Sequence, residues 1–347
     1  SAPCVAEAVQ LSDRQHRVAG SPLLPILRLQ RLSRLPPLPF GILCGALVFT
    51  LVFSPVFLLQ LNQAVILDVA ASVLFFGSSI AIVAGATAPV LHGTARDLEQ
   101  ARGVISISDG DYQTLESGLF RQAGATKALL LLLGLGMGFA HNYLLGHHRN
   151  PMPFLFTQSL ATVLMWVAMM LTLPKMVANA LVFSRLGRVA QPDLLRPSRH
   201  AAFGTAALRP AVFVIGIICA YGFLLLGSGS PLDEWVWLGV ASSFVTLLGI
   251  VVLPLRGIRQ RIQETRGIVL AALDHRIEKL DVREIDQASL RSLDEMDTLL
   301  DMRERVARAP GWPLDLAGLK RILLYTVLPP LSWAAAALVE KVIDSAL

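Results

Sequence analysis

The sequence predicts an all-α membrane protein, a bundle of six to seven transmembrane helices that carries an amphipathic helical arm on its cytoplasmic side. Two observations predict this fold class. Hydrophobic residues make up 54% of the 347 positions and charged residues only 16%, and the mean hydropathy is +0.59, which is more apolar than an ordinary soluble domain. The charges are also grouped in short segments between long uncharged windows. Alternating segments of this kind are typical of a chain that crosses a bilayer repeatedly.

Six uncharged windows are long enough to span the hydrocarbon. A spanning helix needs roughly 20 apolar residues, because the hydrocarbon is about 30 Å thick and each helical residue rises about 1.5 Å. With histidine counted as neutral, the windows are 39–59, 69–91, 128–148, 150–174, 210–232 and 235–255. A seventh window, 322–339, contains Pro329 and Pro330. Two prolines predict either a kinked spanning helix or a re-entrant hairpin there.

The connections between the windows are of two kinds, and their charges predict the orientation. Three very short turns join the windows in pairs and hold one basic residue, Arg149. The N-terminal segment and the two longer loops hold fifteen: Arg14, Arg17, Arg28, Arg31, Arg34, Arg96, Arg102, Arg121, Lys127, Lys175, Arg185, Arg188, Arg196, Arg199 and Arg209. The positive-inside rule therefore predicts a multi-pass protein of the plasma or inner membrane, with its N-terminus and long loops in the cytoplasm.

These features divide the chain into four predicted parts. Residues 1–38 form a cytoplasmic segment, 39–255 a six-helix transmembrane domain of three hairpins, 256–310 a cytoplasmic arm and 311–347 an apolar C-terminal helix. Residues 1–23 lack the apolar core of a secretory signal, so we expect no cleaved signal. Leucines and arginines alternate over 27–35, which predicts a short interfacial helix. The arginines of such a helix attract anionic lipid of the bilayer.

The arm is expected to contain two amphipathic helices. Residues 281–287 interrupt the apolar pattern, so the arm is either one bent helix or a helical hairpin. Its apolar stripe should be buried against its own second half, the cytoplasmic loops or a neighbouring subunit. The apolar positions are Val269, Leu273, Ile277 and Leu280 in the first half and Leu293, Met296 and Leu300 in the second.

Two residues are candidates for a polar transport path. Asp68 is the only acid within an otherwise apolar run, and a buried carboxylate in a bundle is typical of a proton or cation site. It also follows a short turn, so it could reach water instead. His141 lies near His147 and His148, which suggests metal binding, but no carboxylate or cysteine stands at ligand spacing. An interfacial polar cap is the better interpretation, and we expect no metal and no cofactor.

Three further motifs have plain structural interpretations. Asp109, Asp111 and Glu116 resemble a calcium loop superficially but lack its remaining ligands, so we expect a helix, a turn over 108–111 and a second helix. Lys175 at the end of a window is expected to extend to the headgroups. Close helix packing is the prediction for two small-residue pairs, Gly41 with Gly45 and Gly134 with Gly138.

Two functions are compatible with this arrangement. The first is a homo-oligomeric channel or transporter of unknown substrate, favoured by the helix number and the proline-broken last segment. The alternative is a non-transporting membrane sensor or scaffold whose cytoplasmic arm binds a partner. No cluster of catalytic residue types stands in register, so we do not expect an enzyme. The basic residues lie in loops beside apolar windows, so no nucleic-acid partner is expected either.

Overall fold

The structure is a computed structural model that describes residues 24–58, 63–144, 152–226, 234–279, 290–312 and, within 320–342, residues 320, 324, 327–329, 331–335, 338–339, 341 and 342. A few side chains in these ranges, that of Asp68 among them, lie outside the description. The principal helices are α2 (Pro25–Ser33), α3 (Pro37–Leu58), α4 (Gln63–Ala101), α5 (Asp109–Phe120), α6 (Gly124–Leu144), α7 (Met152–Val189), α8 (Ala201–Ala220), α9 (Glu234–Lys279) and α10 (Leu290–Arg308). Short 3-10 helices are η1 (Arg102–Val104), η3 (Pro197–His200) and η4 (Tyr221–Leu226).

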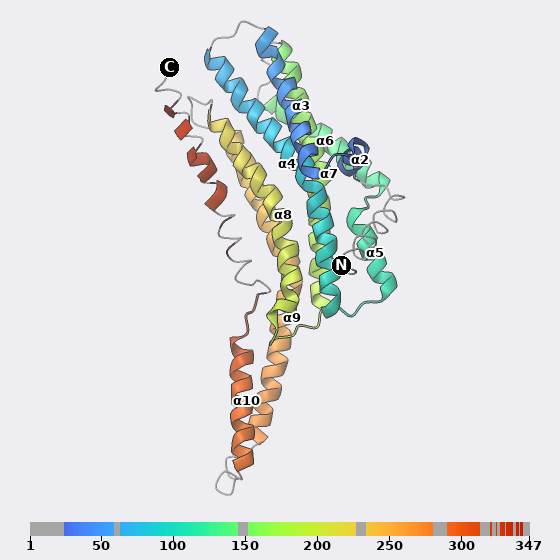
Figure 1. Ribbon diagram of the computed structural model, residues 1–347, viewed down its shortest axis with the longest axis vertical. Coiled ribbons are helices and arrows are strands. Elements are labelled where there is room, and N and C mark those ends of the chain that lie inside the picture. The colour runs from blue at the N-terminus through green and yellow to red at the C-terminus, as the bar shows by residue number, and fades with distance from the viewer. Residues whose placement is uncertain are drawn as a thin grey trace, which may run out of the picture.

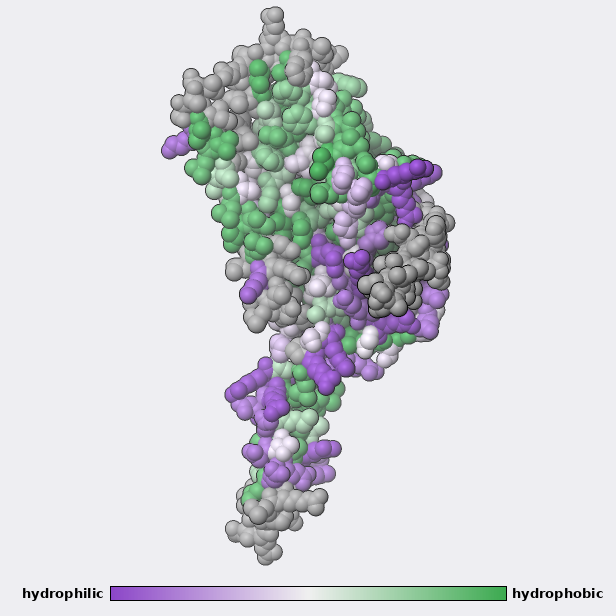
Figure 2. Space-filling model, viewed as in Figure 1, coloured by the Kyte–Doolittle hydropathy of each residue, from purple (hydrophilic) through white to green (hydrophobic). Residues whose placement is uncertain are grey.

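The chain is an integral, multi-pass membrane protein with an all-α fold. Within the described ranges six helices, α3, α4, α6, α7, α8 and α9, are long and apolar enough to cross a bilayer. They stand side by side, and the α9–α10 hairpin projects from one end, which we call the arm end (Figure 1). The other end, where α3 ends and α4 begins, we call the short-turn end. Figure 2 shows apolar side chains over the bundle and polar ones over its arm end and the arm.

Three helices continue beyond the windows predicted to span the membrane. The windows 69–91, 150–174 and 235–255 correspond to α4, α7 and α9, which extend to Ala101, Val189 and Lys279. The extensions contribute buried apolar side chains, such as Leu98, Phe183 and Ile258, to one cluster at the arm end. Hydropathy marks where a helix leaves the hydrocarbon, but these three helices continue beyond that point, where their extensions pack together.

The fifth span is displaced toward the arm end relative to its window. Window 210–232 corresponds to α8, which begins nine residues earlier at Ala201. Its first turns bury Ala202, Phe203 and Ala206 in the arm-end cluster, so a helix forms there although the hydropathy window starts at Pro210. At the other end the helix tightens into η4.

Small residues bring the helices into close contact, as the glycine pairs predict. A Cβ added at Gly41 would lie 2.6 Å from the Ala81 carbonyl oxygen of α4, and one at Gly45 would lie 2.6 Å from the Gly77 carbonyl oxygen. A Cβ added at Gly134 would lie 2.7 Å from the Val167 Cα of α7. These distances are shorter than normal carbon contacts, so the packing interpretation is confirmed.

The loop between the second and third spans contains a helix, α5, as predicted, but residues 109–111 of the predicted turn form the first turn of that helix. Ser108 caps the N-terminus of α5 and accepts a 3.2 Å hydrogen bond from the Asp111 backbone amide. Asp109 forms an ion pair with Arg102, so its carboxylate serves the loop structure. The short helix expected over 27–35 forms as α2, which ends at Ser33, and Leu27 anchors it in the arm-end cluster.

The arm is a helical hairpin, which was one of the two predicted alternatives. α10 packs back along the last turns of α9 and buries Leu273 and Val306 between the helices. Arg303 donates to Asp274 across the hairpin at 2.5 Å, and Arg266 donates to the Ala307 carbonyl. Residues 280–289, which join the helices, lie outside the described residues.

The described part of the C-terminal segment lies beside α8. Trp333 donates its indole N–H to the Ile218 carbonyl at 3.1 Å, and its ring lies against Gly222. Figure 1 shows this segment along α8, extending from the arm toward the short-turn end. Too few of its residues are described to test the alternatives of spanning and re-entrant, and both stay predictions.

A candidate functional site at the arm end of the bundle

A buried carboxylate with charged and hydroxyl partners joins α4 to α8. Asp97 is only 1% exposed, and its carboxylate accepts hydrogen bonds from Arg209 Nε at 3.1 Å and Nη2 at 2.9 Å. The Thr205 hydroxyl donates a third bond at 2.8 Å. A bidentate arginine and a hydroxyl together offset the cost of taking the carboxylate out of water.

Spacing along two helices produces this contact. Thr205 and Arg209 are four residues apart on α8 and therefore share one face, as do Gly93 and Asp97 on α4. The Arg209 side chain passes directly over Gly93, where an added Cβ would overlap it. Gly93 is thus the reason that the guanidinium can reach Asp97. This site is not among the predicted ones, because Asp97 falls outside the apolar windows; the paired i,i+4 spacing is the signal that could have found it.

A small cavity lies beside this contact, where α4, α7 and α8 meet. Its volume is about 10 Å³, room for a single water molecule, and it is lined by the polar side chains of Thr94 and Asn179. The remaining lining is apolar and includes Met176, Phe183 and Pro210. The three helices are therefore closely packed at this level.

Lys175 and Asn179 of α7 hold the C-terminus of α5. The Lys175 ammonium donates to the Gly118 carbonyl, and the Asn179 amide donates to the Leu119 carbonyl at 3.4 Å. Carbonyls in the last turn of a helix have no partner within that helix and carry partial negative charge, so a cation is favourable there. Lys175 is only 9% exposed. The expectation that it extends to the headgroups is therefore wrong, since its ammonium turns inward to α5.

The far end of α7 fixes α9 at the point where the arm begins. Gly187 and Gly257 face each other, and a Cβ on Gly257 would overlap the Ser184 carbonyl oxygen. Arg261 adds a 3.3 Å hydrogen bond from its Nε to the Ala190 carbonyl. One helix therefore contacts both the loop helix α5 and the arm helix α9.

The two predicted transport-path residues lie elsewhere in the molecule. Asp68 belongs to the first turns of α4 and His141 to the last turn of α6, both near the short-turn end. The His141 ring is half-buried and stands edge to face with Trp166, with 5.9 Å between centroids. Nothing in the described contacts assigns a transport role to either residue, so that role stays a prediction.

Metal binding is also not assigned. Among the described residues, no three His, Cys, Asp or Glu side chains lie together in a group that could hold an ion. His147 and His148 fall outside the described residues, so the expectation about the histidine cluster is untested.

Comparison of the chain with models of known protein families, with curated protein sequences and with solved structures gave no match.

Proposed function

We propose that the protein is a non-transporting membrane sensor or scaffold, in which the bundle is coupled mechanically to an arm that binds a protein partner. The observation that carries this proposal is α9. It runs for 46 residues, Glu234–Lys279, from the short-turn end through the membrane and into the arm without a break. A continuous helix transmits tilt or rotation along its length, whereas a flexible linker would not.

Contacts at the base of the arm support the coupling. Besides the close crossing at Gly187 and Gly257, the Arg259 guanidinium lies over the Trp312 ring at 4.1 Å, which ties α9 to the segment that follows α10. A displacement of α7 would reach the arm through these contacts, and α7 is also held to α5 by Lys175.

The arm offers a surface for a partner. Leu293 and Leu300 are each 46% exposed and stand seven residues apart, hence on one face of α10. Asp297 lies beside this face and Asp294 on its flank, and both are exposed. An apolar stripe with acidic neighbours favours a partner segment that is itself apolar and basic.

Distance measurements between spin labels test the coupling. After replacement of the native cysteines, labels are placed at Gln113→Cys on α5 and Thr298→Cys on α10, both exposed positions. Gly187→Ala should shift the measured distance distribution, because it forces α7 and α9 apart. The control Arg276→Gln, on the arm, should not. An unchanged distribution in Gly187→Ala would contradict the proposal.

The second candidate function is the homo-oligomeric channel or transporter. It is supported by buried polar side chains along the interior faces of two helices, Ser79, Thr87 and Thr94 of α4 and Thr162 and Thr172 of α7. The Ser79 hydroxyl is buried and has no hydrogen-bond partner among the described residues, so a path that opened between the helices would offer it to a solute. Solute flux across the membrane of liposomes that contain the purified protein separates the two candidates. A flux that exceeds that of protein-free liposomes, and that is reduced in the Ser79→Val variant, would favour transport over the sensor.

A further inference from the structure

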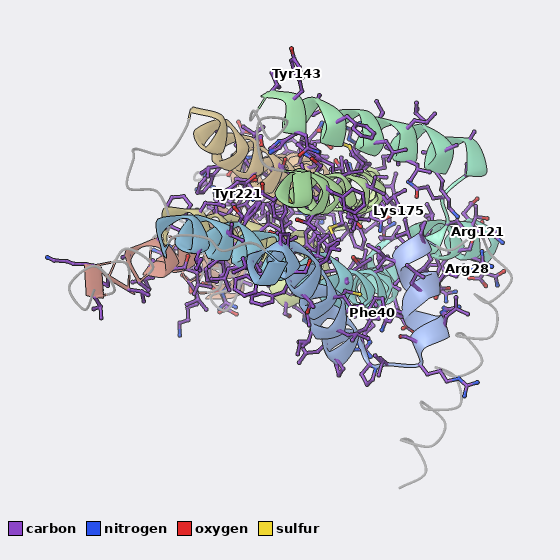
Figure 3. The ribbon with its side chains drawn as sticks, turned by 90° about the horizontal axis from the view of Figure 1, so that it is seen from above. Arg28, Phe40, Arg121, Tyr143, Lys175 and Tyr221 are labelled. Carbon is purple, nitrogen blue, oxygen red and sulfur yellow. The ribbon has the colours of Figure 1, made fainter. Side chains whose placement is uncertain are left out.

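Basic side chains from three elements lie at one corner of the arm end. Arg28 lies on α2, Arg121 directly follows α5, and Lys127 lies in the first turn of α6. The positive charges of Arg28 and Lys127 are close enough to repel one another. In Figure 3 Arg28 and Arg121 lie on the same side of the bundle, far from Tyr143 at the other end of α6. A fold that brings like charges together is stabilised when an anion lies between them.

In the part of the chain that the structure describes, the arginines of this corner have no acidic partner. Within the described ranges, no carboxylate lies within ion-pair distance of Arg28, Arg31, Arg34 or Arg121. Three other arginines of the arm end, Arg102, Arg199 and Arg209, each have an acidic partner.

The position of α2 indicates where the anion comes from. The helix lies across the axis of the bundle, nearly end-on in Figure 1 and lengthwise in Figure 3. Its buried face is anchored by Leu24 and Leu27, while Leu29 and Leu32 on the opposite side are 58% and 72% exposed. A helix that buries one apolar face in protein and presents more leucines beside arginines is suited to the membrane interface.

The adjoining helix faces lipid at the same corner. α6 packs chiefly on α7, and Leu129, Leu132 and Leu133 beyond its first turn are 57%, 66% and 47% exposed. Acyl chains alongside α6 would place their phosphates at the level of Lys127, where the charge-free part of the helix begins.

We propose that Arg28 and Lys127, with Arg121 beside them, form a binding site for the phosphate of an anionic lipid. The site is distinct from a general attraction of the arm end to a negative surface, because it holds a headgroup between α2 and α6 and thereby fixes α2 against the bundle. The same phosphate chemistry could come from a lipid or from a soluble ester, and the lipid is favoured by the exposed leucines on both helices.

Lipid binding to the purified full chain in detergent micelles tests the site. Bound phosphatidylglycerol and phosphatidylcholine are counted by native mass spectrometry, with sn-glycerol 1-phosphate as the soluble probe. We expect the wild type to prefer phosphatidylglycerol. Arg28→Gln combined with Lys127→Gln should weaken that binding about 30-fold, since each basic side chain near an anionic surface contributes roughly fivefold.

Two further variants keep the test decisive. Arg28→Lys retains the charge and should retain binding of phosphatidylglycerol. Arg28→Gln alone should weaken that binding about fivefold. Because it leaves α6 unaltered, this single variant replaces the double variant if the latter fails to fold. The matched control, Arg276→Gln with Lys279→Gln, removes two charges from the distant arm and should bind as the wild type does. Equal binding of both lipids, undiminished binding in the Arg28→Gln variants, or equally tight binding of the soluble ester would overturn the proposal.

Discussion

A single buried carboxylate shows how the arm end is held together at the scale of residues. Asp97 is tolerated inside the protein because Arg209 and Thr205 supply three hydrogen bonds to it. Neither member of the pair is useful alone: an unpaired buried charge is strongly destabilising, although the intact pair adds little net stability. The pair therefore fixes the register of α4 against α8 more than it strengthens the fold.

Removing the arginine should expose this dependence. Arg209→Gln leaves the Asp97 carboxylate buried without its cation, and we expect it to lower the free energy of unfolding in detergent by about 3 kcal/mol. Gly93→Ala should also destabilise, because the added Cβ displaces the same arginine. The two losses should not add, because both substitutions break the same contact. The double variant should lose at least about 1 kcal/mol less unfolding free energy than the sum of the two single losses. Arg185→Gln, an exposed arginine on α7, should change stability by less than about 0.5 kcal/mol. Strict additivity would show that Gly93 and Arg209 act separately.

At the scale of helices, glycine positions decide how closely the elements approach. Gly257 of α9 contacts α7 through its bare Cα, whereas Gly249, two turns earlier on the same helix, has no atom within 4 Å of an added Cβ. The same residue type thus has opposite roles on one helix. One is required for the crossing that begins the arm, and the other is a replaceable position.

This contrast gives a matched pair of variants. Gly257→Ala forces a methyl group into the Ser184 carbonyl, so we expect a loss of about 1 to 3 kcal/mol in unfolding free energy, as for other overpacked sites. Gly249→Ala should be neutral or stabilising by up to about 1 kcal/mol, because alanine is the better helix former. Thermal unfolding in detergent, followed by circular dichroism, measures both. Equal melting temperatures for the two variants would mean that the α7–α9 crossing can relax without cost.

At the scale of the whole molecule, charge and hydropathy divide the protein into a membrane part and an aqueous part. The bundle surface is apolar and the arm end and arm are polar (Figure 2). Because basic residues concentrate at the arm end, we expect that end and the arm to face the cytoplasm.

Cysteine labelling in intact cells tests this orientation. With Cys4, Cys44 and Cys219 replaced by serine, a membrane-impermeant maleimide should label Asn62→Cys in a short turn and should spare Gly110→Cys on α5 until the cells are opened. Gly110 is exposed and an added Cβ meets no packed neighbour, so the substitution should not disturb the fold. Labelling of Gly110→Cys in intact cells would reverse the topology.

The sequence by itself determined the membrane class, the six spans, the glycine contacts and a helical arm. These follow from local quantities: the length of an apolar window, the small size of a residue and the periodicity of an amphipathic helix. The lengths of α4, α7 and α9, the choice of a hairpin for the arm, and the partners of Asp97 and Lys175 were decided only by tertiary structure. Asp97 and Arg209 are 112 residues apart, and Lys175 is 57 residues from the Gly118 carbonyl to which it donates. Such pairings depend on which helices pack together, and hydropathy along the chain carries no information about that.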